Sequence, residues 1–204
     1  MIAHLVAAVL ASAAPQPDSG ARPKDSVPVA GVDDAPRRGT WVEASLGMFT
    51  ARGGGGSFSS GQPYLGMTLG RDLGQRTSIF ASLGLGAASA SCLQAGDQGC
   101  LGADSFGVTF LELGLIRSFP IAERLAISLK ALGGFTDLSP GPVRTGDTVP
   151  DHVPGFHAGA GASFDYATRL DHFAVGLETV VRQTFARDLK LTSVAVMPRI
   201  RYVF

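Results

Sequence analysis

The residues best suited to chemistry in this chain are charged side chains that share one face of its alternating segments. A β-strand points successive side chains to opposite faces, so residues two apart lie on the same face. By this parity, four acidic and four basic residues lie opposite the apolar face. They are Glu43, Glu112, Asp165 and Glu178, with Lys130, Arg182, Arg199 and Arg201.

These charges fit either of two roles, a path for protons or ions or a structural salt network. If the alternating segments described below form a closed barrel of eight strands, the first and last strands are neighbours. We then expect Glu43, on the first, to lie near Arg199 and Arg201, on the last. Consecutive strands are also neighbours, so we expect Glu112 near Lys130. Buried charges must be paired, because removing one partner costs roughly 3–5 kcal/mol. Eight strands leave no aqueous channel, which favours the structural network.

The two cysteines, Cys92 and Cys100, fall in one connection between alternating segments. In an exported protein such a pair predicts a disulfide. Closing a loop of this size is worth about 2–3 kcal/mol in the chain-entropy model. A metal site would need further cysteine or histidine nearby, and this connection contains none. We predict no metal ion and no cofactor.

The elements that must position these residues are eight segments in which apolar and polar residues alternate. They span 41–49, 64–70, 78–89, 106–117, 124–135, 156–166, 172–185 and 194–204. Their lengths are near the 9–11 residues that a tilted strand needs to cross a bilayer. An even number of strands is typical of single-chain bacterial barrels.

The connections between these segments alternate in length. Those after the first, third and fifth segments are long (51–63, 92–105 and 136–155), and those after the second, fourth and sixth are short (71–77, 118–123 and 167–171). The seventh connection, 186–190, is also short, which departs from the pattern. Short periplasmic turns alternating with longer outer loops are typical of outer-membrane barrels.

A soluble barrel or sandwich would show the same alternation, but with its polar face toward water. Here the second face is rich in glycine, at positions 47, 66, 70, 84, 86, 114, 134, 159, 161 and 176. Glycine weakens strands, so a solvated face gains little from it, whereas a narrow lumen can use the space. We therefore predict an eight-stranded antiparallel transmembrane up-and-down β-barrel in the bacterial outer membrane, spanning residues 39–204.

Residues before this barrel indicate export. Residues 1–13 have the apolar core and small-x-small cleavage site of a signal peptide, although the usual basic start is missing. Residues 14–38 are rich in proline and charge, so we expect a disordered periplasmic tail. The chain has 17 basic and 17 acidic residues, so no nucleic-acid partner is expected.

From Thr40 to Phe204 the chain resembles the small eight-stranded outer-membrane barrels, including adhesion-resistance and membrane-anchor types. The ending Tyr202-Val203-Phe204 resembles the signal that the barrel-assembly machinery reads in that family. Arg199 and Met197 occupy positions where the family has polar residues and glycine, so the match is partial. The cysteine loop and the composition are also similar to outer-membrane barrels of gliding-motility machines.

Lipid-modifying barrels of this size share the strand number, and one class places serine two residues after a histidine. Here Gly159 stands two residues after His157, so that motif is missing. We therefore expect a non-enzymatic barrel with a structural, adhesion or envelope-assembly role, motility complexes included. Its partners would be outer-membrane lipid, the assembly machinery and other envelope proteins, the last through the outer loops, above all 136–155. The alternative is a lipid-acting enzyme or a narrow conduit.

Overall fold

The computed structural model describes residues 39–53, 56–57, 61–89, 105–141, 150–170, 172–186 and 189–204. These residues form nine strands. They are β1 (Thr40–Gly53), β2 (Gly56–Ser57), β3 (Gln62–Asp72), β4 (Thr77–Ser89), β5 (Ser105–Ala122), β6 (Leu125–Ser139), β7 (Val153–Ala167), β8 (Phe173–Ala186) and β9 (Leu189–Val203). No helix in this part of the chain is long and apolar enough to cross a membrane.

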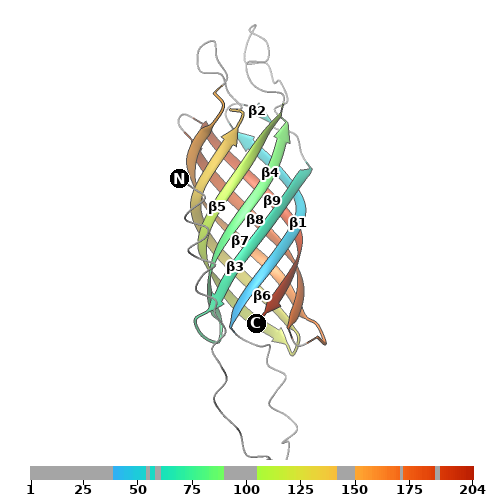
Figure 1. The fold of residues 1–204 in the computed structure, drawn as a ribbon. Coiled ribbons are helices and arrows are strands. Elements are labelled where there is room, and N and C mark those ends of the chain that lie inside the picture. Colours follow the sequence, from blue (N-terminus) through green and yellow to red (C-terminus); the bar gives the residue numbers. More distant parts are fainter. Residues whose placement is uncertain are drawn as a thin grey trace, which may run out of the picture. The chain divides into compact units, whose positions relative to one another are not determined.

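Eight of the strands close into an antiparallel up-and-down barrel (Figure 1). Each long strand pairs with the next one along the chain, and β1 pairs with β9 to close the sheet. The two-residue strand β2 pairs only with the outer end of β1, where Arg52 is opposite Ser57. The predicted fold class is confirmed.

The strands are staggered around the barrel. One row of paired residues can be followed from Glu43 through all the strands to Leu191, which pairs with Gly53 of β1. The row therefore returns to the first strand ten residues nearer the outer end. This stagger tilts the strands, so residues paired across neighbouring strands lie at different heights in the membrane.

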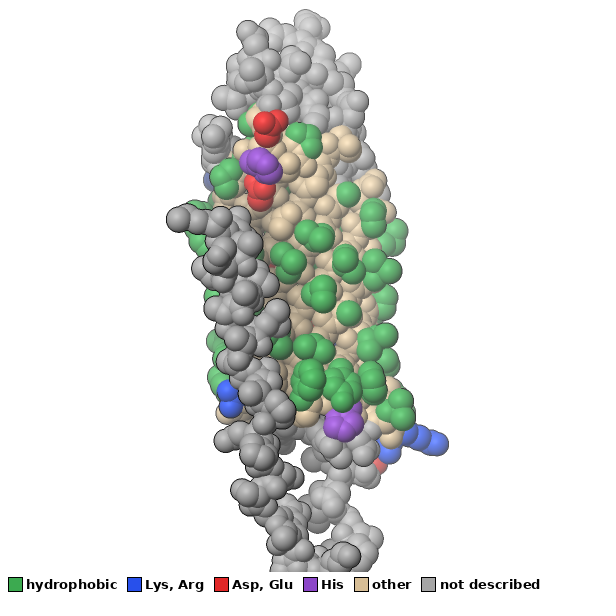
Figure 2. All heavy atoms as spheres, viewed as in Figure 1, with side chains coloured by type: hydrophobic (Ala, Val, Ile, Leu, Met, Phe, Trp, Pro, Cys, Tyr) green, Lys and Arg blue, Asp and Glu red, His purple; other side chains and the backbone are tan. Residues whose placement is uncertain are grey.

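The outer surface of the barrel is apolar over its middle. Figure 2 shows apolar side chains spread over the strands, with charged side chains toward the two ends of the face in view. Leu113 is 68% exposed and Met67 is 62% exposed. Exposed apolar surface of this extent marks contact with lipid. With a closed, even-stranded barrel, it places the protein in the bacterial outer membrane.

The strands extend further than the apolar alternation predicts. β5 continues to Ala122, so the turn after it is only Glu123 and Arg124. β6 reaches Ser139 and β7 begins at Val153, so the third outer connection is shorter than the predicted 136–155. Backbone pairing continues past the lipid-facing belt because it depends on hydrogen bonds and not on apolar side chains. The predicted segments 1–13 and 14–38 lie outside the described residues.

Candidate functional site

At its periplasmic end the lumen is filled by aromatic rings that lie over glycines of neighbouring strands. Trp41 is paired with Gly70, and Phe80 is paired with Gly114. A Cβ on Gly114 would lie 2.7 Å from two carbons of the Phe80 ring. Glycine on the inward face therefore leaves the space that these rings occupy, which explains why that face is rich in it.

The charged residues of the lumen form two groups. The group nearer the periplasmic end is centred on Arg199, and we name it the lower charge cluster. Arg199 Nη1 lies 3.0 Å from Glu43 Oε2 and 2.7 Å from Glu178 Oε2. Its Nη2 lies 2.5 Å from Asp165 Oδ1 and donates a hydrogen bond of 2.7 Å to Ser163. Arg201 binds Glu43 at 2.9 Å, and Lys130 forms a short ion pair with Glu178. The members of the cluster are Glu43, Lys130, Asp165, Glu178, Arg199 and Arg201.

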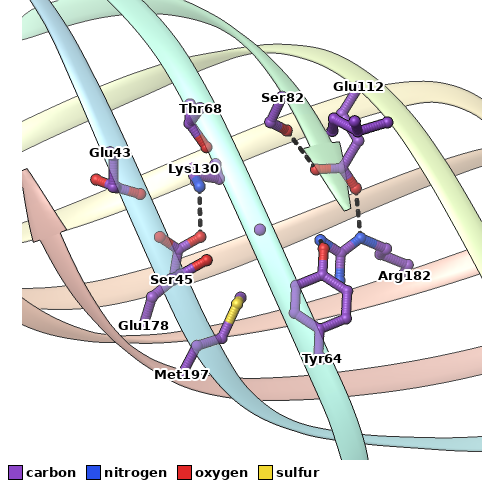
Figure 3. Close-up of a pocket in the computed structure, with 12 residues that line it drawn as sticks. Glu43, Ser45, Tyr64, Thr68, Ser82, Glu112, Lys130, Glu178, Arg182 and Met197 are labelled. Carbon is purple, nitrogen blue, oxygen red and sulfur yellow. Dashed lines mark hydrogen bonds and ion pairs between the residues drawn. The ribbon is translucent and has the colours of Figure 1, made fainter. Parts of the chain in front are cut away.

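The upper charge cluster consists of Tyr64, Ser82, Glu112, His157 and Arg182, and Figure 3 shows all of these except His157. Glu112 accepts a short hydrogen bond from Arg182 Nε and one of 2.8 Å from Ser82. Arg182 Nη2 donates to the Tyr64 hydroxyl at 2.9 Å, and the guanidinium lies 4.7 Å from the Phe110 ring centre. Only 2% of Arg182 is exposed, so this cation is held inside the barrel.

All eight predicted lumen residues face inward, but one expected pairing differs. Glu43 lies against Arg199 and Arg201, as the closing seam requires. Glu112, however, pairs with Arg182 and Lys130 pairs with Glu178. In the β5–β6 ladder Glu112 is opposite Gly134, whereas Lys130 is opposite Ile116. The two residues are therefore separated along neighbouring strands, and partners across the lumen lie closer.

Parity places His157 in the lumen, but the sequence did not indicate that Tyr64, Ser82 and Thr136 would join it around Glu112 and Arg182. His157 Nε2 lies 3.3 Å from Glu112 Oε1, and its Nδ1 lies 2.7 Å from the Thr136 hydroxyl. The His157 ring also packs edge-on against Phe110 at 5.2 Å. Strand parity places these residues on the inward face. Which of them lie at the same height in the lumen depends on the register between the strands. His157 is thus a bonded lumen histidine.

A small cavity separates the two charge clusters. Its volume is ≈ 10 Å³, counted as the space that the centre of a water molecule can occupy. A cavity of this size has room for about one water. Lys130 and Glu178 line it on one side and Glu112 and Arg182 on the other (Figure 3). Such a cavity can hold a bridging water, but it is far smaller than a ligand pocket.

Above the upper cluster, mainly apolar side chains fill the outer part of the lumen, with the buried hydroxyls of Thr184 and Ser193 beside them. Phe110 and Leu138 are fully buried there, and Val108 and Leu191 are nearly so. The Phe49 ring stacks with the Tyr64 ring, with 6.1 Å between the ring centres, and so links these apolar side chains to the upper charge cluster. An ion would have to displace packed hydrocarbon to pass. We define the apolar plug as Phe49, Val108, Phe110, Leu138 and Leu191.

Outside the lumen, polar side chains lie at the outer rim. His152 Nδ1 is 2.8 Å from Asp137 Oδ2, with the His152 side chain exposed and Asp137 half-buried. Within the described residues no three metal-binding side chains are grouped. The predicted disulfide residues Cys92 and Cys100 lie outside the described residues.

The predicted assembly signal lies at the opposite end of the barrel. Tyr202 is surrounded by aromatic rings, with Phe204 at 5.1 Å, Phe173 at 5.0 Å and His172 at 5.4 Å. Phe204 is 66% exposed. The rings form part of the girdle expected where a barrel meets the membrane interface.

Comparison with known proteins supports the fold. No family model and no curated protein matches the sequence. The structure of Neisserial surface protein A (NspA) matches with a TM-score of 0.62 and 13% identity, over 81% of this chain and 97% of that one. The fold is that of a small outer-membrane barrel.

Two further structures match less well. Ail, the attachment invasion locus protein of Yersinia pestis, has a TM-score of 0.47 and 10% identity, over 81% of this chain and 100% of that one. The N-terminal β-barrel domain of Pseudomonas aeruginosa OprF has a TM-score of 0.44 and 11% identity, with the same coverage of 81% and 100%. The likenesses to Ail and OprF, with TM-scores under 0.5, carry no argument, and the likeness to NspA, at 13% identity, shows the fold alone.

Proposed function

We propose that this protein is a non-enzymatic outer-membrane anchor that holds its outer loops at the cell surface for adhesion or envelope assembly. The observation that carries the proposal is the filled lumen. Two charge clusters and the apolar plug occupy it from end to end, with a cavity of ≈ 10 Å³ between the clusters. Among the described residues this filled lumen offers no ligand-sized pocket, so we place the contacts of the protein outside it.

The outer end of β6 and β7 supports this role. Phe135, Phe156 and Phe185 are paired in a row across β6, β7 and β8 on the lipid-facing surface. Beyond this row β6 and β7 stay paired, with Asp137 opposite Pro154. The exposed His152 side chain, held by Asp137 Oδ2 at 2.8 Å, can bind a polar group of a protein or glycan partner. Rigid strands thus position polar side chains above the membrane.

The proposal includes two further partners. The barrel-assembly machinery would recognise Tyr202 and Phe204 during insertion, since both side chains are aromatic and lie at the end of the last strand. An envelope complex for motility would be one of the partners that the outer loops bind. Loss of surface translocation in a loop variant would identify that partner.

The experiment that tests the proposal shortens the third outer connection between Ser139 and Pro150. We expect the shortened barrel to remain in the outer membrane and to run faster unheated than boiled on a detergent gel. Adhesion or capture of envelope partners should be lost. The matched control changes the lumen pair Glu112 and Arg182 to glutamine together, which keeps the net charge.

The lumen variant should keep full adhesion or capture if it folds. The opposite pattern, in which the loop variant keeps activity and the lumen variant loses it, would support the lipid-acting enzyme or conduit. A protein that fractionates as a soluble species would contradict the membrane anchor altogether.

A further inference from the structure

The periplasmic rim of the barrel is chemically uneven. On β7, β8 and β9 the outward side chains at this end are aromatic, with Tyr166, Phe173 and Tyr202. On β3 and β5 the outward side chains near this end are Arg71 and Arg117. The outward strand positions on one side of the rim therefore present aromatic rings to the membrane, and those on the other side present positive charge.

Arg71 and Arg117 lie close together on the lipid-facing surface. Arg71 is paired with Ile79 of β4, and Arg117 is paired with Thr77 of the same strand. Only β4 lies between them, so their backbones are two strand spacings apart, about 10 Å. Following the pairing from Arg71 through Ile79 leads to Leu115, and Arg117 is two residues nearer the periplasm than Leu115. Because the row of paired residues rises toward the outer end from strand to strand, the two arginines lie at similar heights.

The side chain of Arg117 is directed toward β4. Its Nη1 donates a hydrogen bond of 2.8 Å to the Thr77 hydroxyl. Arg76, in the turn before Thr77, is held beside this pair because its carbonyl oxygen accepts a hydrogen bond of 2.8 Å from the Ser118 amide. Three arginines thus gather around the start of β4. We name Arg71, Arg76 and Arg117 the periplasmic arginine cluster.

No carboxylate neutralises this cluster within the described residues. None of its arginines forms an ion pair there. Asp72 is next to Arg71 in sequence but accepts hydrogen bonds from Ser78 at 2.6 Å and from the Trp41 indole at 3.2 Å. The carboxylate closest in sequence is therefore turned into the barrel and occupied.

The surroundings of Arg117 are apolar on both sides. Along the outward face of β5 it lies between Leu115, 53% exposed, and Phe119, 40% exposed. A charge on the lipid-facing surface is costly unless an anion or water reaches it. A lipid phosphate at the depth of the interface would satisfy the guanidinium while its chains contact the neighbouring apolar residues.

We propose that the periplasmic arginine cluster binds the phosphate of an anionic phospholipid in the periplasmic leaflet. Guanidinium groups match phosphate oxygens in charge and in hydrogen-bond geometry. Arg71 and Arg117 flank the site and the Thr77 hydroxyl orients Arg117. The apolar residues Ile79 and Leu115, on the midplane side of the two arginines, contact the acyl chains.

The experiment measures lipid retention by the full barrel in detergent, using native mass spectrometry. Cardiolipin and phosphatidylcholine are added in equal amounts, and wild-type protein should retain cardiolipin in preference. Near an anionic surface each arginine is worth about 1 kcal/mol, so each one removed should weaken retention by roughly fivefold. The double variant Arg71→Gln/Arg117→Gln should therefore lose most of the preference.

Two variants serve as controls. Arg169→Gln removes an exposed arginine from the turn after β7, on the aromatic side, and should leave the preference unchanged. Arg71→Lys/Arg117→Lys keeps the charge and should keep most of the preference, with loss at high salt. This second variant also provides the test if the glutamine variant fails to show a heat-modifiable band.

Three results would overturn the proposal. They are equal retention of both lipids by wild-type protein, undiminished preference in the glutamine variant, and a preference that high salt leaves unchanged. A self-associated barrel that dissociates in the glutamine variant while lipid retention stays the same would instead identify a second copy as the occupant.

Discussion

Arg199 on the last strand and Glu43 on the first lie 3.0 Å apart, from Nη1 to Oε2, so an ion pair crosses the seam where the barrel closes. The backbone pairing of this seam is interrupted nearby. It runs from Trp41 opposite Val203 to Ser45 opposite Arg199, and it resumes where Met48 is opposite Val196. Pro198 lies in the gap and has no amide hydrogen to donate. The ion pair therefore holds β1 and β9 together beside their weakest stretch.

Replacing Arg199 by glutamine should destabilise the barrel strongly. The change leaves Asp165 without its guanidinium partner and takes one partner each from Glu43 and Glu178. Breaking a buried pair on one side costs roughly 3–5 kcal/mol. The free energy of unfolding would be measured by urea titration in phospholipid vesicles. Arg201→Gln is the matched control, and it should cost less because Glu43 keeps Arg199. Equal losses would contradict a network centred on Arg199.

Replacing Leu129 by arginine tests the assignment of faces on β6. Leu129 is 52% exposed on the lipid-facing side, whereas Lys130 faces the lumen and binds Glu178. An arginine near the middle of the bilayer should lower the free energy of unfolding by about 2–4 kcal/mol. Leu170→Arg, in the turn after β7, should have little effect. If both variants unfold at the wild-type urea concentration, Leu129 does not face lipid.

Replacing Gly114 by alanine tests whether the aromatic rings need the glycines beneath them. The new methyl group would lie 2.7 Å from the Phe80 ring and closer still to the Ala131 carbonyl oxygen. Overpacking of this kind costs about 1–3 kcal/mol. Gly107→Ala provides the comparison, because its methyl group would meet only the Ser139 carbonyl oxygen, at 3.4 Å. Urea titration should show a loss for the first variant and almost none for the second.

The two cysteines should be joined in the mature protein. Cys92 and Cys100 fall in one outer connection of an exported chain, where oxidation favours a disulfide. Mass spectrometry of freshly isolated, unreduced protein should find one linked peptide containing both residues. Alkylation of both thiols before reduction would refute the disulfide.

The faces of the strands could be predicted from the sequence because side chains alternate with a fixed period of two. Leu113 outward and Glu112 inward follow from that rule alone. The ends of the strands could not, since Arg117 interrupts the outward apolar residues of β5 before Phe119 and Ile121, and β6 continues past its last outward apolar residue, Phe135. The sequence therefore did not predict that β5 extends to Ala122 and β6 to Ser139.

Which charged side chains form ion pairs within the lumen could not be predicted from the sequence either. Whether Glu112 meets Lys130 or Arg182 depends on the stagger of the strands, and alternation is unchanged when a strand shifts by two residues. The seam was the exception, because closure of the barrel by itself makes the first and last strands neighbours. Glu43 could therefore be assigned to Arg199 and Arg201 in advance.

Conductance across a planar lipid bilayer measures whether the lumen is sealed. Purified, heat-modifiable protein should insert without producing discrete current steps, because the apolar plug and the two charge clusters fill the barrel. Stable current steps that change when Glu112 and Arg182 are both replaced by glutamine would show that ions pass through the lumen, and the sealed anchor would then be wrong.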